Sequence, residues 1–162
     1  MSSGSWPSPH YSMTSAPYDG PVPNYNDSNV ARLMNAVRQG NTNTARTLIE
    51  DGTHVDSMSW TGQTPLITAA IAGKTVTVRM LLEKGATVQP GVLHLVAGGP
   101  DLAMVRLFVE QGHDDVNLRD FLHQTPLHRA AMYGRADIAK YLIEHGARIH
   151  AKDVEGKTPL HI

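Results

Sequence analysis

Histidine is the residue type whose abundance in this chain suggests chemistry, because the sequence has nine His and no Cys. The lack of Cys excludes disulfides, thiolate zinc sites and a cysteine nucleophile. His94, His128 and His161 recur at one position of a sequence repeat that is described below. Ligands of a single zinc ion must all lie about 2 Å from it. Three histidines that are a repeat apart are therefore not expected to share an ion.

A second group with possible chemistry is His113-Asp114-Asp115, which follows Gly112 in an expected loop. It is the best local candidate for a metal site, but nothing in the sequence places its carboxylates opposite one another. We predict a solvated loop there, with no metal and no other cofactor. A small metal-dependent enzyme built on these three residues remains the alternative, and elemental analysis would test it.

Other catalytic signatures are missing from the sequence. Gly98-Gly99-Pro100-Asp101 is glycine-rich but lacks the Lys-Ser/Thr end and the preceding strand of a phosphate-binding loop. Neither Gly-x-Ser-x-Gly nor His-Glu-x-x-His occurs. The sequence therefore predicts that the protein is not an enzyme, and no small-molecule substrate is expected.

Charge and hydropathy narrow the class of partner. The chain has 14 Lys and Arg against 15 Asp and Glu, for a net charge of -1. Such a balance provides no strong field for nucleic acid or an anionic membrane. No apolar run approaches the roughly 20 residues that span a bilayer. A signal peptide is not recognised either, so we expect a cytoplasmic or nuclear protein.

Residues 1–25 differ in composition from the rest of the chain. They contain five prolines, at positions 7, 9, 17, 21 and 23, and one charged residue, Asp19. Proline lacks an amide donor and fixes φ, so we predict a disordered Ser/Pro-rich tail. Two alternatives stay open: a leader beginning Met1-Ser2-Ser3-Gly4-Ser5, or a short linear motif. The motif would use one of the aromatic residues Trp6, Tyr11, Tyr18 and Tyr25.

From residue 26 onward the chain repeats itself. Leucines that we call the anchor leucines follow one another at separations of 33, 27, 34 and 33 residues: Leu33, Leu66, Leu93, Leu127 and Leu160. A glycine lies 19 residues after each of the first four, and a turn residue lies seven after each. The repeat is thus about 33 residues long, and one boundary has lost six residues. The expected units are 26–56, 57–88, 89–117, 118–150 and a partial 151–162.

Each unit has the pattern of a helical hairpin. In the fourth, Thr125 before Pro126 is the order typical of an N-cap followed by the first helical residue. Small residues follow, then Gly134, then the apolar spacing of a second helix, which Gly146 ends. The pattern predicts two short antiparallel helices and a returning segment.

These residues resemble the ankyrin repeat. The resemblance rests on Thr125-Pro126-Leu127-His128 and Thr158-Pro159-Leu160-His161, on Leu142 to Ala147 at the end of a second helix, and on Ala151 to Gly156. It implies an all-α solenoid of stacked helix-turn-helix units with short β-hairpin fingers. It also implies that the motif histidine bonds the adjacent backbone and so joins neighbouring units. The repeat-motif positions are Thr64, Pro65, Leu66, Leu93, His94, Thr125, Pro126, Leu127, His128, Thr158, Pro159, Leu160 and His161.

Departures from the motif mark the third unit. Gly91 replaces the capping Thr, and the six missing residues fall between Gly85 and Gly91. We therefore predict that this finger is absent, which would leave a shallow gap in the surface. At the other end, the chain stops within the fifth unit's expected first helix. This predicts either a longer array or a frayed end.

The resemblance further implies a protein-protein interaction module, a scaffold or adaptor that binds a protein partner through a concave groove. Finger tips and the ends of first helices line that groove in the family. Here these positions carry Trp60, Thr61, Ile71, Phe121, Leu122, Met132 and Tyr133, the predicted partner-binding residues. A structural spacer within a larger protein is the other alternative.

Overall fold

The computed structural model describes residues 27–111 and 114–161, which form eight α-helices and one 3-10 turn. The predicted tail over residues 1–25 lies outside the described residues. The helices are α1 (Ser28–Gln39), α2 (Thr42–Glu50), α3 (Pro65–Ile71), α4 (Thr75–Glu83), α5 (Val92–Ala97), α6 (Leu102–Glu110), α7 (Pro126–Met132) and α8 (Ala136–Glu144).

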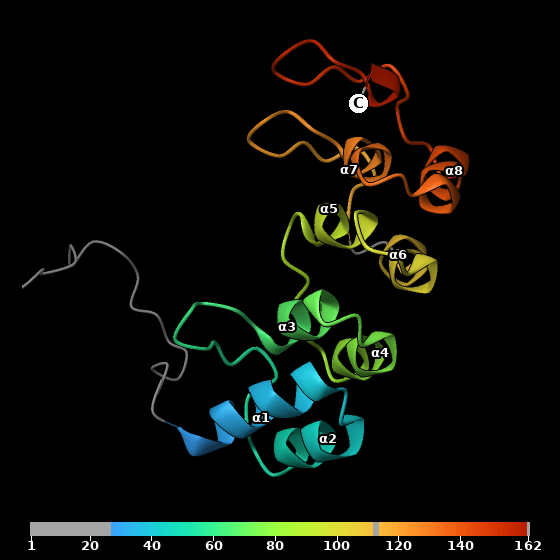
Figure 1. The fold of residues 1–162 in the computed structure, drawn as a ribbon. Helices are drawn as coiled ribbons and strands as arrows, with labels where there is room; N and C mark the ends of the chain where they lie inside the picture. Colours follow the sequence, from blue (N-terminus) through green and yellow to red (C-terminus); the bar gives the residue numbers. More distant parts are fainter. Residues whose placement is uncertain (1–26, 112–113, 162) are drawn as a thin grey trace, which may run out of the picture.

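Two layers of helices form a curved stack, as Figure 1 shows. The first helices of the four pairs, α1, α3, α5 and α7, lie side by side in an inner layer on the side toward which the loops project. Their partners α2, α4, α6 and α8 form the outer layer. Contacts join each helix to its hairpin partner and to the equivalent helix of the next pair. The predicted all-α solenoid is confirmed.

The helix ends follow from the local sequence. Thr64 caps α3 by accepting a hydrogen bond from the Ile67 N–H at 3.4 Å, and Pro65 takes the first helical position. Gly40 adopts a φ of 75°, which lets its amide reach back to carbonyls of α1. Thr125 and Pro126 repeat the same start at α7, and Gly134 follows that helix with a φ of 65°.

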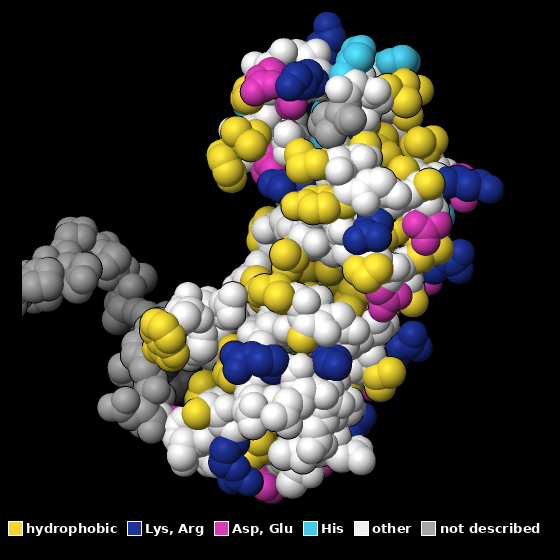
Figure 2. Space-filling view, in the orientation of Figure 1, with side chains coloured by type: hydrophobic (Ala, Val, Ile, Leu, Met, Phe, Trp, Pro, Cys, Tyr) yellow, Lys and Arg dark blue, Asp and Glu magenta, His cyan; other side chains and the backbone are white. Residues whose placement is uncertain are grey.

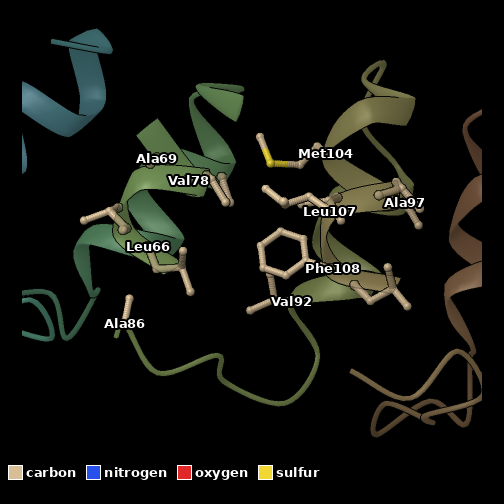
Figure 3. Packing of buried hydrophobic residues seen from close by; sticks show 14 of the residues in the cluster. Leu66, Ala69, Val78, Ala86, Val92, Ala97, Met104, Leu107 and Phe108 are labelled. Atoms are coloured by element: carbon tan, nitrogen blue, oxygen red, sulfur yellow. The ribbon is translucent and has the colours of Figure 1, made fainter. Parts of the chain in front are cut away.

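The core runs along the stack between the layers. Four anchor leucines, Leu33, Leu66, Leu93 and Leu127, are buried, and small residues such as Ala69 let neighbouring helices approach closely. Figure 3 shows the junction between the second and third pairs, where Phe108 of α6 points toward α3 and α4. Stacking therefore covers the apolar face that no single hairpin could cover by itself.

Three segments, called finger 2 (57–63), finger 4 (118–124) and finger 5 (151–157) after the units they open, project from the stack (Figure 1). The described residues include no β-strand, so the expected β-hairpin fingers take the form of short turns closed by backbone hydrogen bonds. Two backbone hydrogen bonds close each finger. The first runs from Ser59 N–H to Gln63 C=O, from Asp120 N–H to Gln124 C=O and from Asp153 N–H to Lys157 C=O, each at 2.9 Å. The second returns from the Gly62, His123 and Gly156 N–H groups to the Ser59, Asp120 and Asp153 C=O groups, at 2.8, 2.9 and 3.0 Å. Each finger is therefore a tight hairpin turn in which a residue at positive φ, Gly62, His123 or Gly156, follows the turn.

The segment between α4 and α5 has no finger, as the shortened repeat predicted. Gly91 precedes α5 with a φ of 93° and provides no side-chain cap. Instead the Asp114 carboxylate, 21 residues further on, accepts the Leu93 N–H at 2.9 Å. A distant side chain has thus taken over the role of the missing threonine.

The opening of the fifth unit also differs from the expected helix. It is a 3-10 turn, Pro159–His161, and its anchor leucine, Leu160, is 82% exposed while the other four are buried.

Candidate functional site

The predicted partner-binding residues are exposed in the structure. Trp60 on finger 2 and Phe121 on finger 4 are each 85% exposed, which is unusual for large aromatic side chains. The remaining members are exposed to a lesser degree: Thr61, Ile71, Leu122, Met132 and Tyr133. In Figure 2 apolar side chains appear on fingers 2 and 4 and across the inner helices between them.

A carboxylate at the base of each of the last two fingers holds its tip. Asp120 Oδ1 accepts the Leu122 and Gln124 N–H groups at 2.9 Å each, and Asp120 Oδ2 accepts from Arg129 at 3.1 Å. Burial of the Asp120 carboxyl opposes its ionisation. The hydrogen bonds outweigh that effect and hold the Asp120 pKa below its ordinary value. The tip that carries Phe121 is therefore fixed by charge-assisted bonds.

The residues equivalent to Asp120 hold the tips of the other two fingers. Burial likewise opposes ionisation of Asp153, while backbone bonds from Lys157 and Glu155 lower its pKa. In finger 2 the position holds Ser59, whose hydroxyl accepts the Gln63 N–H at 3.2 Å and contacts the Thr61 hydroxyl at 2.6 Å. The tip with Trp60 thus keeps a neutral version of the same support.

On the inner helices, Tyr133 packs against the third unit. A Cβ atom added to Gly98 would lie 2.9 Å from the Tyr133 ring, so only glycine admits the ring there. Arg135 strengthens this junction, because its Nε donates to the Gly98 C=O at 3.1 Å. Part of Tyr133 is consequently structural, although more than half of its side chain remains exposed.

A cavity of about 470 Å³ lies between α5 and α7, beside this contact. Its lining residues are Gly91, His94, Leu95, Gly98, Gly99, Arg129 and Tyr133. Only Tyr133 among these was a predicted partner-binding residue. Leu95 and Arg129 were missed, although each lies two residues after its anchor leucine. That shared offset is the signal that could have found them.

The repeat-motif histidines join neighbouring units through backbone carbonyls, as the resemblance implied. His94 Nε2 donates to the Gln124 C=O at 2.9 Å, and His128 Nε2 donates to the Lys157 C=O at 3.2 Å. The Nδ1 atom of His128 lies 3.1 Å from the Thr125 N and 2.9 Å from its hydroxyl. Thr158 and His161 repeat that contact at 3.3 and 3.0 Å. These side chains act in stacking rather than in chemistry.

The group His113-Asp114-Asp115, the alternative metal site of the sequence analysis, is only partly described, because His113 lies outside the described residues. The Asp114 carboxylate bonds the Leu93 and Asp115 N–H groups, and Asp115 Oδ1 accepts from the Asn117 N–H at 2.8 Å. Both carboxylates therefore accept hydrogen bonds from backbone N–H groups, one of them in α5. Within residues 27–111 and 114–161, no helix is long and apolar enough to cross a membrane.

Comparison with known proteins places these features in context. A model of ankyrin repeats, described as three copies, matches residues 20–91 and again 92–162. Human rabankyrin-5 is 36% identical over 74 residues, 46% of this chain and 6% of that protein. The inactive serine/threonine-protein kinase TEX14 of Bos taurus is 30% identical over 134 residues, 83% of this chain and 7% of its own length. NF-kappa-B inhibitor alpha of Gallus gallus is 34% identical over 87 residues, 52% of this chain and 26% of that protein.

Proposed function

Because this chain belongs to the ankyrin-repeat family, whose repeats generally mediate protein-protein interactions, we propose that it is a non-catalytic scaffold or adaptor module. It holds a protein partner against its inner helices and fingers. It corresponds to only 6% and 7% of the length of rabankyrin-5 and TEX14, so the proposal concerns the repeat array alone.

The observation that carries the proposal is the exposure of Trp60 and Phe121 on fingers that are themselves well fixed. Aromatic side chains are enriched at the centres of protein interfaces, where each buries a large apolar area. Ile71, Met132 and Tyr133 extend the exposed apolar surface along the inner helices. Pre-organised fingers lower the entropic cost of association, because little ordering is left to occur on binding.

The test compares binding with stability in the same variants. Partners captured from a lysate by the wild-type chain are identified by mass spectrometry, and their affinity is then measured for Trp60→Ala and Phe121→Ala. Each substitution should weaken binding by about 2 kcal/mol or more while leaving the unfolding midpoint nearly unchanged.

Leu127→Ala is the matched control, since Leu127 is buried in the core. It should cost about 2–5 kcal/mol of stability and leave the affinity of the folded fraction intact. If the two aromatic variants bind as tightly as wild type, or lose affinity only by unfolding, the proposed surface is wrong. Tolerance of both substitutions would favour a structural spacer.

A further inference from the structure

Fingers 4 and 5 are joined by one backbone hydrogen bond, which defines how neighbouring fingers meet in this array. The Val154 N–H of finger 5 donates to the Leu122 C=O of finger 4 at 3.0 Å. Val154 lies six residues before its anchor leucine, and Leu122 lies five before the preceding one. Repeat equivalence leads us to expect the same two groups to face each other in any other pair of adjacent complete fingers.

Because the third finger is missing, both halves of this bond lack a partner within residues 27–111 and 114–161. The Phe121 N–H of finger 4 is equivalent to that of Val154, and the Thr61 C=O of finger 2 is equivalent to that of Leu122. Neither group bonds any residue that the structure describes. Repeat equivalence places them on the finger edges that border the gap. Figure 2 shows the outline of the molecule receding between fingers 2 and 4.

Two residues that line the cavity between α5 and α7 have a buried polar atom without a partner among the described residues. His94 is 8% exposed, and its Nδ1 has no partner in the described chain, whereas His128 Nδ1 contacts Thr125. The difference arises because Gly91 occupies the threonine position. Arg129, which shares the lining, has a buried Nε that is also unpartnered among the described residues.

We propose that this gap binds a turn-forming segment of the partner, which takes the place of the missing finger. The segment accepts the Phe121 N–H with one backbone C=O, donates a backbone N–H to the Thr61 C=O, and packs apolar side chains against Trp60 and Phe121. It is extended rather than helical, because a helix has already paired the amides and carbonyls that these edges require. This inference rests on the proposed function, since it specifies what the partner presents to the same surface.

A peptide from the chain itself is the probe. A cyclised peptide with the sequence of residues 117–125 reproduces finger 4, whose Leu122 C=O already accepts the equivalent bond from Val154. Added to the 15N-labelled protein, it should shift the amide resonance of Phe121 and slow its hydrogen exchange. N-methylation of the peptide's phenylalanine removes the backbone N–H that would donate to the Thr61 C=O. This should weaken binding about tenfold if the bond forms as inferred.

The matched protein variant fills the gap. Six residues inserted between Gly85 and Gly91 restore the length of the other connections, and helical circular dichroism checks that the variant folds. The filled variant should not bind the peptide. Equal binding to wild type and filled variant, an unperturbed Phe121 amide, no binding at all, or no effect of N-methylation would each overturn the inference.

These outcomes are separate from those for the proposed function. A first outcome is a partner affinity that depends on Trp60 and Phe121 and yet is unchanged in the filled variant. That result would support the scaffold role but contradict the inference that a segment of the partner takes the place of the missing finger. Partner affinity that depends on neither aromatic residue would contradict the proposed partner-binding surface, regardless of whether the peptide binds.

Discussion

At the scale of single residues, equivalent positions of the three fingers reach one backbone conformation with different side chains. Gly62 and Gly156 have φ values of 78° and 77°, as a left-handed turn requires, but finger 4 has His123 at a φ of 58°. A non-glycine residue is strained in this region. The sequence predicted the finger tips correctly by offset, but it could not show this strain, because His is an ordinary residue until its φ is known.

Replacing the strained residue should stabilise the protein. We expect His123→Gly to raise the free energy of unfolding by up to about 1 kcal/mol, because glycine adopts a positive φ without a steric cost. Urea denaturation measures the change. Gly62→Ala is the reverse control and should destabilise, since its φ is 78°. No gain from His123→Gly would mean that the imidazole makes a compensating contribution.

Acid should weaken finger 4 through Asp120. Its folded-state pKa lies below the unfolded value of about 3.9, so the carboxylate contributes stability above that pH. The contribution is lost as pH falls through the folded-state pKa. Asp120→Asn should therefore be less stable than wild type at neutral pH, and the difference should shrink as pH falls below about 4.

Thermal midpoints across the acid range measure this convergence. Glu83→Gln, an exposed α4 carboxylate that bonds no described residue, should instead track the wild type throughout. A constant difference for Asp120→Asn would show that its ionisation is not coupled to folding.

At the scale of elements, local signals predicted the helices better than the segments between them. Thr-Pro starts and glycine stops placed the helical hairpins, since capping depends on residues close in sequence. The cap of α5 was not predictable in this way. Leu93 and Asp114 are 21 residues apart, and only the completed stack brings them together. The 3-10 turn at Pro159–His161 was likewise missed, because its sequence matches the start of a helix.

Removal of this distant cap should loosen α5 specifically. Asp114→Ala should cost about 1 kcal/mol, the usual contribution of a side-chain cap, and should speed hydrogen exchange of the Leu93 amide. Asp115→Ala is the neighbouring control, because its carboxylate bonds Asn117 and not α5. If both variants change the Leu93 exchange rate equally, the effect belongs to the loop and not to the cap.

At the scale of the whole molecule, the stack has one weaker junction. α3 and α5 contact each other less extensively than α1 and α3 or α5 and α7. No finger bridges that junction, and Ile67 stands where the next two units carry a carbonyl-bonding histidine. The repeat spacing predicted the missing finger. It did not predict the reduced contact between α3 and α5, which depends on how both helix layers pack around the short segment between α4 and α5.

Unfolding should therefore proceed in two parts. In a repeat array stability is the sum of unit and nearest-neighbour terms, so a weak junction separates the cooperative blocks. Hydrogen exchange at rising denaturant concentration should give one opening free energy for α1–α4 and a different one for α5–α8. A single common value for all eight helices would show that the junction transmits full cooperativity.

The absent third finger also has a mechanical consequence. The Val154–Leu122 bond between fingers 4 and 5 can act as a strut that resists bending, but only where the fifth unit meets α7. α3 and α5 share neither such a strut nor a connecting finger, and they contact each other less extensively than α1 and α3 or α5 and α7, so bending of the solenoid should concentrate between them. Under load we expect the two halves of the array to pivot at this junction first.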